Sequence, residues 1–290
     1  MKIWINGEVM AAEEATISPF DHGYLYGLGV FETFRTYNGH AFLIGDHLDR
    51  LHASLNEMGI RYHIKNEEVA QMIEKLQTAN GGEDGYFRLN VSAGVRDIGL
   101  YPDPYESPTV ILLQKALPPQ TTKGKEGRWL KLSRNTPETD IRLKSHHYFN
   151  NLAGRREITD GTVVEGLFLT KEGYVAEGVT SNLFWIKNQT LYTPSIETGI
   201  LPGVTRQFIL AITEKAGLRI EEGLYLKEAV LKAEEVFITN SIQEIVPIHS
   251  IDHLHFQGTE GKWTNHLKAI YSQKTSTLIR SADYVTMKEQ

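Results

Sequence analysis

The stretch IRLKSHHYFNN, residues 141–151, places Lys144 between the apolar Leu143 and a cluster of serine, histidine and tyrosine. A lysine becomes a nucleophile when desolvation or positive neighbours favour its neutral amine. Residues 128–144 hold five basic side chains against two acidic ones, although the chain as a whole is acidic. This setting suits an amine with a chemical role, but most loop lysines are simply solvated, and on these residues alone a solvated lysine stays the more common alternative.

The composition excludes several classes of protein. The chain has 290 residues, 41% of them hydrophobic, which suffices for two compact domains, and it lacks cysteine, so disulfides and thiolate chemistry are excluded. Its net charge of −6 comes without a basic block, so we expect no nucleic-acid partner. No apolar run approaches the roughly 20 residues that span a bilayer, and residues 1–10 alternate like a strand. We therefore expect a cytoplasmic protein without a membrane partner.

The hydrophobic patterns predict an α+β fold, with strands predominating and no regular alternation of strand and helix. Residues 117–128 are polar and rich in proline and glycine, which predicts a small N-terminal domain (1–117), a linker (118–127) and a larger C-terminal domain (128–290). The helices expected from apolar spacing are 46–58, 66–79, 147–158, 204–216 and 262–280. The strands expected include a hairpin around Asn6-Gly7 and the runs 86–94, 108–117, 129–133, 166–170, 174–177, 181–186, 190–194 and 236–240.

Three segments suggest a site for a phosphorylated aromatic cofactor. In ILPGVTR, residues 200–206, Pro-Gly precedes a helix whose first-turn amides at Val204 and Thr205 suit a phosphate, although an ordinary turn has the same pattern. TNS, residues 239–241, adds hydroxyl and amide donors after a strand. Glu177 precedes small residues, and a carboxylate at the ring nitrogen keeps pyridoxal phosphate protonated.

These segments resemble the class IV, D-amino-acid/branched-chain aminotransferase-like fold (fold type IV) of pyridoxal-phosphate enzymes. The resemblance rests on SPFDHGYLYGLGVFETFR (18–35), FLIGDHLDRL (42–51), RLKSHHYFNN (142–151), GYVAEGVTSNLFW (173–185), LYTPSIETGILPGVTR (191–206) and EEVFITNSIQEIVPI (234–248). It implies pyridoxal 5′-phosphate as cofactor, Lys144 as the Schiff-base lysine and general acid/base, and a homodimer. The cofactor-binding residues that it implies are Arg50, Lys144, Glu177, Thr180, Val204, Thr205 and Ser241.

Within this family, NTPETDIRLKSHHYFNN is most similar to the branch of 4-amino-4-deoxychorismate lyases of Bacillus type, which form 4-aminobenzoate and pyruvate in folate biosynthesis. Phe31 stands where the D-amino-acid branch has a tyrosine. Branched-chain enzymes share that phenylalanine and a tyrosine at the position of Tyr26, but they have a glycine-rich stretch where this chain has SHHY. The resemblance therefore implies a carbon–oxygen lyase, with branched-chain or D-amino-acid aminotransferase as the alternative.

A small anionic substrate with two carboxylates requires cations, and arginine offers a two-pronged donor. The candidates for substrate binding are Tyr26, Thr33, Arg88, Arg134, Arg142 and His146. Two alternatives outside the family stay open at this stage. Several histidines and acids could form a metal hydrolase site, although no recognised ligand spacing appears and we expect no metal, and the fold could serve a noncatalytic binding protein. The loop 19–26 is where we expect the dimer interface.

Overall fold

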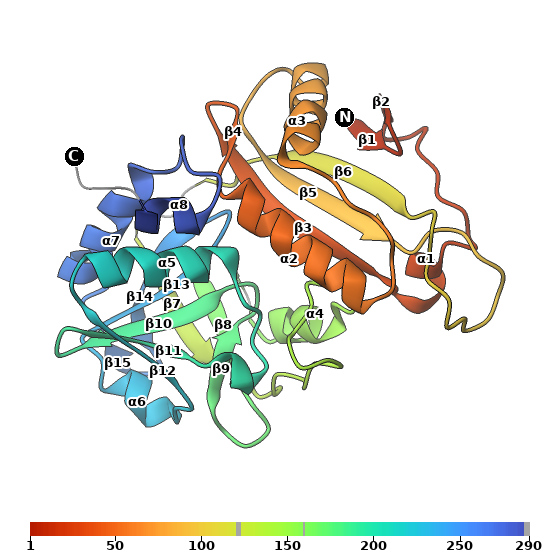
Figure 1. Cartoon of the computed structure of the whole chain (residues 1–290). Helices are drawn as coiled ribbons and strands as arrows, with labels where there is room; N and C mark the ends of the chain where they lie inside the picture. The colour runs from red at the N-terminus through yellow and green to blue at the C-terminus, as the bar shows by residue number, and fades with distance from the viewer. Residues whose placement is uncertain (120–122, 159, 287–290) are drawn as a thin grey trace. The chain divides into compact units, whose positions relative to one another are not determined.

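The computed structural model describes residues 1–119, 123–158 and 160–286, which form two compact units (Figure 1). The first unit comprises Met1–Pro118, Leu143–His147 and Thr275–Arg280, and the second comprises Pro119–Arg142, Tyr148–Lys274 and the C-terminal segment from Ser281. The predicted linker, 118–127, includes residues 120–122, which lie outside the described residues. The predicted domain boundaries therefore stay a prediction.

The first unit is built on a six-stranded antiparallel sheet with strand order β2-β1-β6-β5-β3-β4. Helices α2 and α3 pack on this sheet around one hydrophobic core (Figure 1). The strands are β1 Lys2–Ile5, β2 Glu8–Ala11, β3 Gly29–Tyr37, β4 His40–Ala41, β5 Gly85–Ser92 and β6 Thr109–Ala116, and the helices are α1 His22–Tyr26, α2 Ile44–Glu57 and α3 Asn66–Ala79.

Alternation along β3 and β5 gives this sheet two chemically different faces. Val30 and Phe34 lie in the core beneath the helices, with Glu32 between them on the same face. The intervening residues Phe31 and Thr33 share the opposite face with their cross-strand partners Asn90 and Arg88. Two of the predicted substrate residues, Thr33 and Arg88, are therefore direct neighbours in the sheet.

The second unit contains a nine-stranded mixed sheet, whose strand order is β12-β11-β10-β13-β14-β7-β8-β9, with β15 paired to β14. Its strands are β7 Lys125–Trp129, β8 Val164–Leu169, β9 Val175–Gly178, β10 Asn182–Lys187, β11 Thr190–Pro194, β12 Arg219–Gly223, β13 Glu235–Asn240, β14 Glu244–Ile251 and β15 Leu254–His255. Its helices are α4 Phe149–Arg156, α5 Val204–Lys215, α6 Lys227–Leu231, α7 Lys262–Ser272 and α8 Ser281–Thr286, with short 3₁₀ turns η1 Ile196–Thr198 and η2 Gly258–Glu260.

Two predicted elements are wrong in their bounds. The strand expected at 129–133 lies earlier in the chain and is β7, Lys125–Trp129. The polar stretch around Gly127 pairs with both β14 and β8, and the lack of a side chain on Gly127 leaves room for Ile251 and Leu167. The helix expected over 262–280 ends at Ser272. Residues 275–280 join the first unit instead, where the carbonyls of Leu278 and Ile279 accept hydrogen bonds from residues 43 and 45 at the start of α2.

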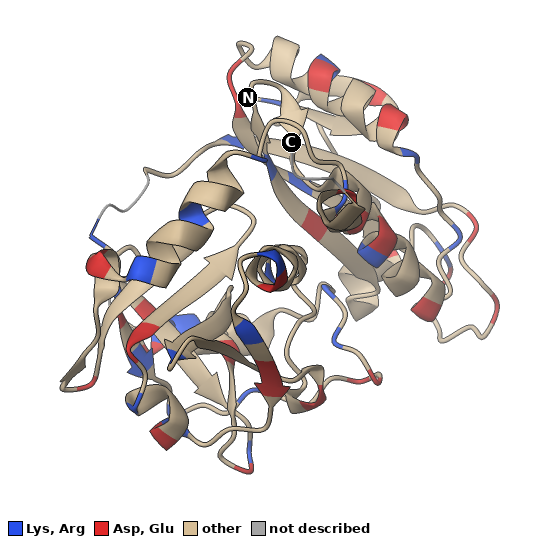
Figure 2. Ribbon diagram, turned by 60° about the vertical axis from the view of Figure 1, so that its left-hand side comes forward, with Lys and Arg blue, Asp and Glu red and all other residues tan. Residues whose placement is uncertain are grey.

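The charged residues are interspersed along the elements of both units (Figure 2). Within the described chain, no helix is long and apolar enough to cross a membrane.

Candidate active site

The segment that carries Lys144 is fixed to the beginning of β3 by backbone pairing. The amide of Phe31 donates to the carbonyl of Lys144 (2.8 Å), the amide of His146 donates to the carbonyl of Gly29 (2.9 Å), and Val30 and Ser145 form an antiparallel bridge. The Lys144 side chain is partly buried, and its Nζ lies 4.6 Å from the centre of the Phe31 ring. The backbone is held in place while the amine lies over an aromatic surface.

Phe31 also organises the other polar groups on this face of the sheet. The Arg88 guanidinium lies 3.5 Å from the Phe31 ring centre, and its Nε donates to Asn90 Oδ1 (2.9 Å). The His146 ring stacks with Phe31 at a centroid distance of 6.4 Å. The structure thus brings Lys144, Arg88 and His146, all predicted from the sequence, around one phenylalanine, with Thr33 paired to Arg88.

The environment of His146 keeps its ring uncharged. Burial, followed by the positive charge of Arg88, lowers the pKa of His146 to about 4. A Cβ on Gly29 would lie 2.5 Å from the ring, so glycine at this position provides the space that the histidine occupies. At neutral pH this face of the sheet presents a neutral imidazole beside a cationic guanidinium.

Arg50 on α2 is held by a buried carboxylate on β3. Its Nε and Nη2 donate to the two oxygens of Glu32 at 2.7 and 2.6 Å, and His47 Nδ1 bonds to the same carboxylate at 2.7 Å. Burial alone would raise the pKa of Glu32, but Arg50 and His47 outweigh it and lower the pKa to about 2. Burial lowers the pKa of His47, so the imidazole is neutral and acts as a hydrogen-bond donor to Glu32.

Sequence reasoning missed Glu32 and His47. A signal was present, because Glu32 occupies a position of β3 that alternation assigns to the buried face between Val30 and Phe34. A charged residue in such a position needs a partner. The partners lie on α2, at His47 and Arg50.

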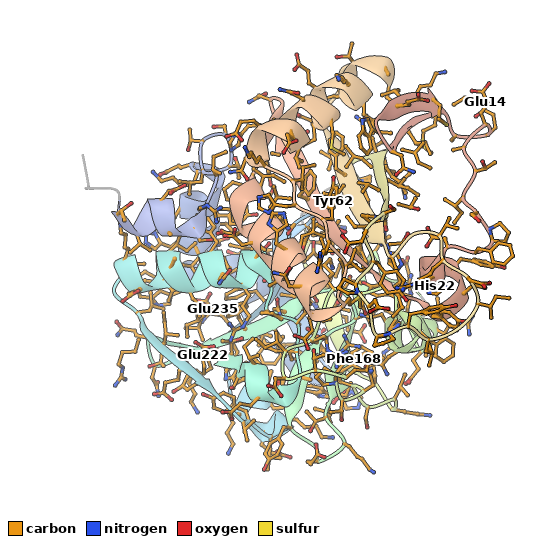
Figure 3. All side chains as sticks on the ribbon, turned by 45° about the vertical axis from the view of Figure 1, so that its right-hand side comes forward. Glu14, His22, Tyr62, Phe168, Glu222 and Glu235 are labelled. Carbon is orange, nitrogen blue, oxygen red and sulfur yellow. The ribbon has the colours of Figure 1, made fainter. Side chains whose placement is uncertain are left out.

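Tyr26 contacts a different part of the first unit. Its hydroxyl accepts a hydrogen bond from the amide of Gly99 (3.0 Å), and its ring meets His22, labelled in Figure 3, edge to face at 4.8 Å. His22 in turn bonds to Tyr105 and to the carbonyl of Asp97. These contacts tie α1 to the loop after β5, and the predicted substrate role of Tyr26 stays a prediction.

In the second unit, Glu177 at the end of β9 is almost completely buried among hydrogen-bond donors. Oε1 accepts from Arg134 Nε (2.8 Å), and Oε2 accepts from the amide of Leu201 (2.9 Å) and from Asn182 Nδ2 (3.5 Å). Arg142 Nε lies 3.9 Å from Oε1. A carboxylate offers about four acceptor positions, so this arrangement leaves capacity for a further N–H donor such as a protonated ring nitrogen.

Arg134 and Arg142, both predicted to bind substrate, make their contacts within the protein. Arg134 Nη1 donates to the side-chain oxygens of Asn150 (2.6 Å) and Asn151 (3.2 Å), in addition to the bond from Nε to Glu177. Arg142 donates to the carbonyls of Gly199 and Asn135, and burial, followed by the charge of Arg134, lowers its pKa to about 10, so it stays protonated at neutral pH. These contacts favour a positioning role around Glu177.

The N-terminus of α5 has features that suit an anion, and we call this region the cradle. The helix begins at Val204 after Gly203, with no side-chain cap and no acidic residue in its first turn. Thr205 Oγ1 lies 3.3 Å from Ser241 Oγ, so two hydroxyls accompany the first-turn amides. A Cβ on Gly203 would approach Asn182 Oδ1 to 2.0 Å, which explains the glycine. Thr180, the remaining predicted cofactor residue, is exposed in the turn after β9.

Asn182 joins this cradle to the Glu177 carboxylate, since its Nδ2 donates to the carbonyl of Leu201 (2.9 Å) as well as to Glu177. A buried acceptor for a ring N–H and an oxyanion cradle thus lie on one connected set of residues in this unit. The chemistry of this donor set fits pyridoxal phosphate, which carries a basic ring nitrogen and a phosphate. No group of three or more histidine, aspartate or glutamate side chains in the described part of the chain is arranged to hold a metal ion.

The model of the family named amino-transferase class IV matches residues 29–251, and the chain belongs to this family. The family uses pyridoxal phosphate, so the protein is a pyridoxal-phosphate-dependent class IV enzyme with a small-molecule substrate, and the predicted fold class and cofactor are confirmed.

Among relatives, the chain is 44% identical over 280 residues to aminodeoxychorismate lyase of Bacillus subtilis (strain 168), covering 96% of each chain. It is 34% identical over 256 residues to a putative branched-chain-amino-acid aminotransferase of Methanocaldococcus jannaschii, covering 87% of this chain and 88% of the relative. A solved branched-chain aminotransferase from the thermophilic archaeon Thermoproteus uzoniensis, crystallised with norvaline, superposes with a TM-score of 0.85 at 26% identity, covering 95% of each chain.

Proposed function

We propose that this enzyme is a 4-amino-4-deoxychorismate lyase that forms 4-aminobenzoate and pyruvate. The observation that carries the proposal is the polar, cationic face around Phe31, where Arg88 and the neutral His146 lie beside Lys144. A face of this kind suits a substrate with two carboxylates better than an aliphatic side chain. The higher identity to the Bacillus subtilis lyase than to the aminotransferases supports the same choice.

The proposal keeps the cofactor-binding residues that the sequence predicts. Glu177 would accept the ring N–H, and the first-turn amides at Val204 and Thr205, with Ser241 and the guanidinium of Arg50, would hold the phosphate. Thr180 stays a predicted cofactor-binding residue without a more specific role. When bound, pyridoxal phosphate supplies an aldehyde that bonds an amine and a ring that accepts electrons. Glu32 and Arg134 orient Arg50 and Glu177 respectively.

The chain's own residues then perform binding and proton transfer. Arg88, braced by Phe31 and Asn90, presents its guanidinium to a substrate carboxylate. Lys144 Nζ removes the proton from the ring carbon that bears the substrate amine, and the bond between the adjacent ring carbon and the enolpyruvyl oxygen breaks as the ring becomes aromatic. Lys144 then returns the proton to the methylene carbon of the released enolpyruvate, which becomes pyruvate. His146, uncharged at neutral pH, can donate or accept a hydrogen bond without repelling Arg88.

We also propose that the enzyme is a homodimer and that the segment 19–26, which the sequence predicted as a loop and whose residues 22–26 form α1, contributes to the interface. Phe20, Tyr24 and Leu25 expose 46%, 70% and 37% of their surface in this segment, which supports the assignment. Sedimentation of the purified protein at two concentrations tests it, and a mass of one chain at both would contradict it.

The activity is tested by supplying aminodeoxychorismate and following the fluorescence of 4-aminobenzoate. The wild type should produce this fluorescence and Lys144→Ala should not, whereas Lys115→Ala, which changes an exposed lysine on β6, serves as the matched control. Rapid transfer of the amino group from leucine or D-alanine, without an aromatic product, would show that the enzyme is an aminotransferase instead.

A further inference from the structure

A lysine of the stretch expected to be a linker is buried in the second unit. Lys125, on β7, is 2% exposed, and its Nζ bonds to Glu165 Oε2 on the neighbouring strand β8 at 3.3 Å and to Gln243 Oε1 at 3.2 Å. Burying a charged pair carries a desolvation penalty that mutual attraction offsets only partly, so such a pair is weak evidence for stability. We therefore looked for a role of this ion pair in the residues that the two side chains hold in place.

At one end, Glu165 holds the turn between β9 and β10. Its Oε1 accepts from Ser181 Oγ (2.7 Å), while the carbonyl of Ser181 accepts from the amide of Gly178 (2.8 Å). A Cβ at residue 178 would lie 2.1 Å from Ser181 Oγ and 2.5 Å from Glu165 Oε1, so the turn closes only over glycine. This turn lies directly between Glu177 and Asn182.

At the other end, Lys125 orients the amides of the turn between β13 and β14. An ammonium group only donates, so Gln243 must present its oxygen to Lys125. The same oxygen accepts from Asn240 Nδ2 (3.4 Å), which turns Asn240 Oδ1 toward the amides of Ile242 (3.0 Å) and Gln243 (2.8 Å). Ser241 lies inside this turn, and its hydroxyl is 3.3 Å from that of Thr205.

We propose that Lys125 and Glu165 form a positioning pair that holds the Ser241 turn in the conformation that binds the cofactor phosphate. The pair acts through Gln243 and Asn240, and it connects the Ser241 turn to the turn that follows Glu177. The inference rests on the proposed assignment of Ser241 to the phosphate cradle. Neither Lys125 nor Glu165 is proposed to touch the cofactor.

The test compares two ligands that differ only in the phosphate. Pyridoxal 5′-phosphate and pyridoxal are titrated into cofactor-free protein, and bonding to Lys144 is followed by absorbance and verified by borohydride reduction and peptide mapping. In the variant Lys125→Met/Glu165→Gln, which keeps an acceptor for Ser181 and leaves no unpaired charge, the affinity for pyridoxal phosphate should fall about tenfold and that for pyridoxal less than about twofold. Gln243→Leu, which removes only the link to the turn, should act in the same direction and serves if the double variant fails to fold.

Glu235→Gln is the matched control for a buried carboxylate in the same unit. Glu235, labelled in Figure 3, accepts from the amides of Trp263 (3.0 Å) and Thr264 (2.7 Å) at the start of α7. This substitution should lower the Tm without separating the two affinities.

Three outcomes decide the matter. Unchanged affinity for pyridoxal phosphate in both variants would overturn the inference, as would an equal loss for both ligands, which indicates general loosening. A wild type that forms no bond between pyridoxal phosphate and Lys144 would contradict the proposed site itself, and this result is distinguishable from the other two.

Discussion

Replacing Glu32 with glutamine tests whether the buried carboxylate is what holds Arg50 in place. The pKa of Glu32 is lowered from an ordinary value of 4.5 to about 2, although burial opposes the change. A difference of about 2.5 corresponds to about 3 kcal/mol at 1.36 kcal/mol for each pKa unit, which agrees with the 3–5 kcal/mol typical when one partner of a buried ion pair is removed. Glu32→Gln should therefore lower the free energy of unfolding at pH 7 by about 3 kcal/mol.

The stabilisation by Glu32 should also depend on pH, which gives a second test. A carboxyl whose pKa is lower in the folded state stabilises the protein fully above its unfolded pKa of 4.5, and this contribution is lost as the pH falls toward about 2. The wild type should lose this part of its stability over that window, and Glu32→Gln should not.

The measurement is urea unfolding between pH 2 and 7, with hydrogen exchange of peptides from β3 and α2 to report on the first unit. Glu106→Gln is the control, because the pair between Arg61 and Glu106 is 67% and 61% exposed and contributes little. If Glu32→Gln unfolds with the wild-type free energy at pH 7 and the same pH slope, the carboxylate does not carry the stability assigned to it.

Three further predictions concern the site directly. Arg88→Lys should raise the KM for aminodeoxychorismate about tenfold with a smaller change in kcat, because the amine cannot present a fork to a carboxylate, and steady-state kinetics measure this; an unchanged KM would exclude Arg88 from substrate binding. Gly203→Ala should weaken pyridoxal phosphate binding, since the new Cβ would approach Asn182 Oδ1 to 2.0 Å. Titration of cofactor-free protein measures the affinity, and an unchanged affinity would contradict the prediction. His146→Asn should leave the shape of the kcat/KM profile between pH 5.5 and 8 unchanged, because the pKa of His146 is about 4 and the ring is neutral throughout; loss of an ionisation near pH 6.5 in the variant would refute the neutral ring.

Sequence periodicity predicted those helices whose buried residues all lie on one face. The helix expected over 66–79 is α3 with the same bounds, because Val69, Met72, Ile73 and Leu76 form one buried stripe. The helix expected at 204–216 is α5, one residue shorter. In both cases local spacing coincides with the face that packs.

The elements that sequence patterns missed are those in which distant partners compensate for an unfavourable residue. Lys125 appeared to be part of a polar linker, yet Glu165, 40 positions later, allows it to be buried at the start of strand β7. Glu32 looked like one more residue of an aromatic strand until α2 brought His47 and Arg50 to it. The pattern of hydrophobic residues along a sequence cannot predict ion pairs between residues that are distant in the chain.

The same limit applies to the site. The structure brings Lys144 and Arg88 to Phe31 and pairs Thr33 with Arg88 through β-strand alternation and a paired segment, and the roles predicted for them stay predictions. The partners of Arg134 could not be predicted, because the sequence contains an arginine with a plausible charge but no indication that Glu177 and Asn151 surround it. Candidate residues were chosen by chemical type, whereas their partners depend on tertiary contacts.

Three buried acid–base pairs, Glu32 with Arg50, Glu177 with Arg134 and Glu165 with Lys125, share a physical logic. Replacing both partners of a buried ion pair by apolar residues is often neutral or stabilising, whereas removing one partner alone is strongly destabilising. Stability therefore does not explain why three such pairs are present. Two of the pairs include a residue proposed to hold the cofactor, and the pair of Glu165 with Lys125 is proposed to support one through Gln243 and Asn240. An ion pair fixes direction in a way that apolar packing does not, since its donors and acceptors must face each other. These pairs therefore hold a guanidinium or an amide in one orientation, which apolar packing alone would not do.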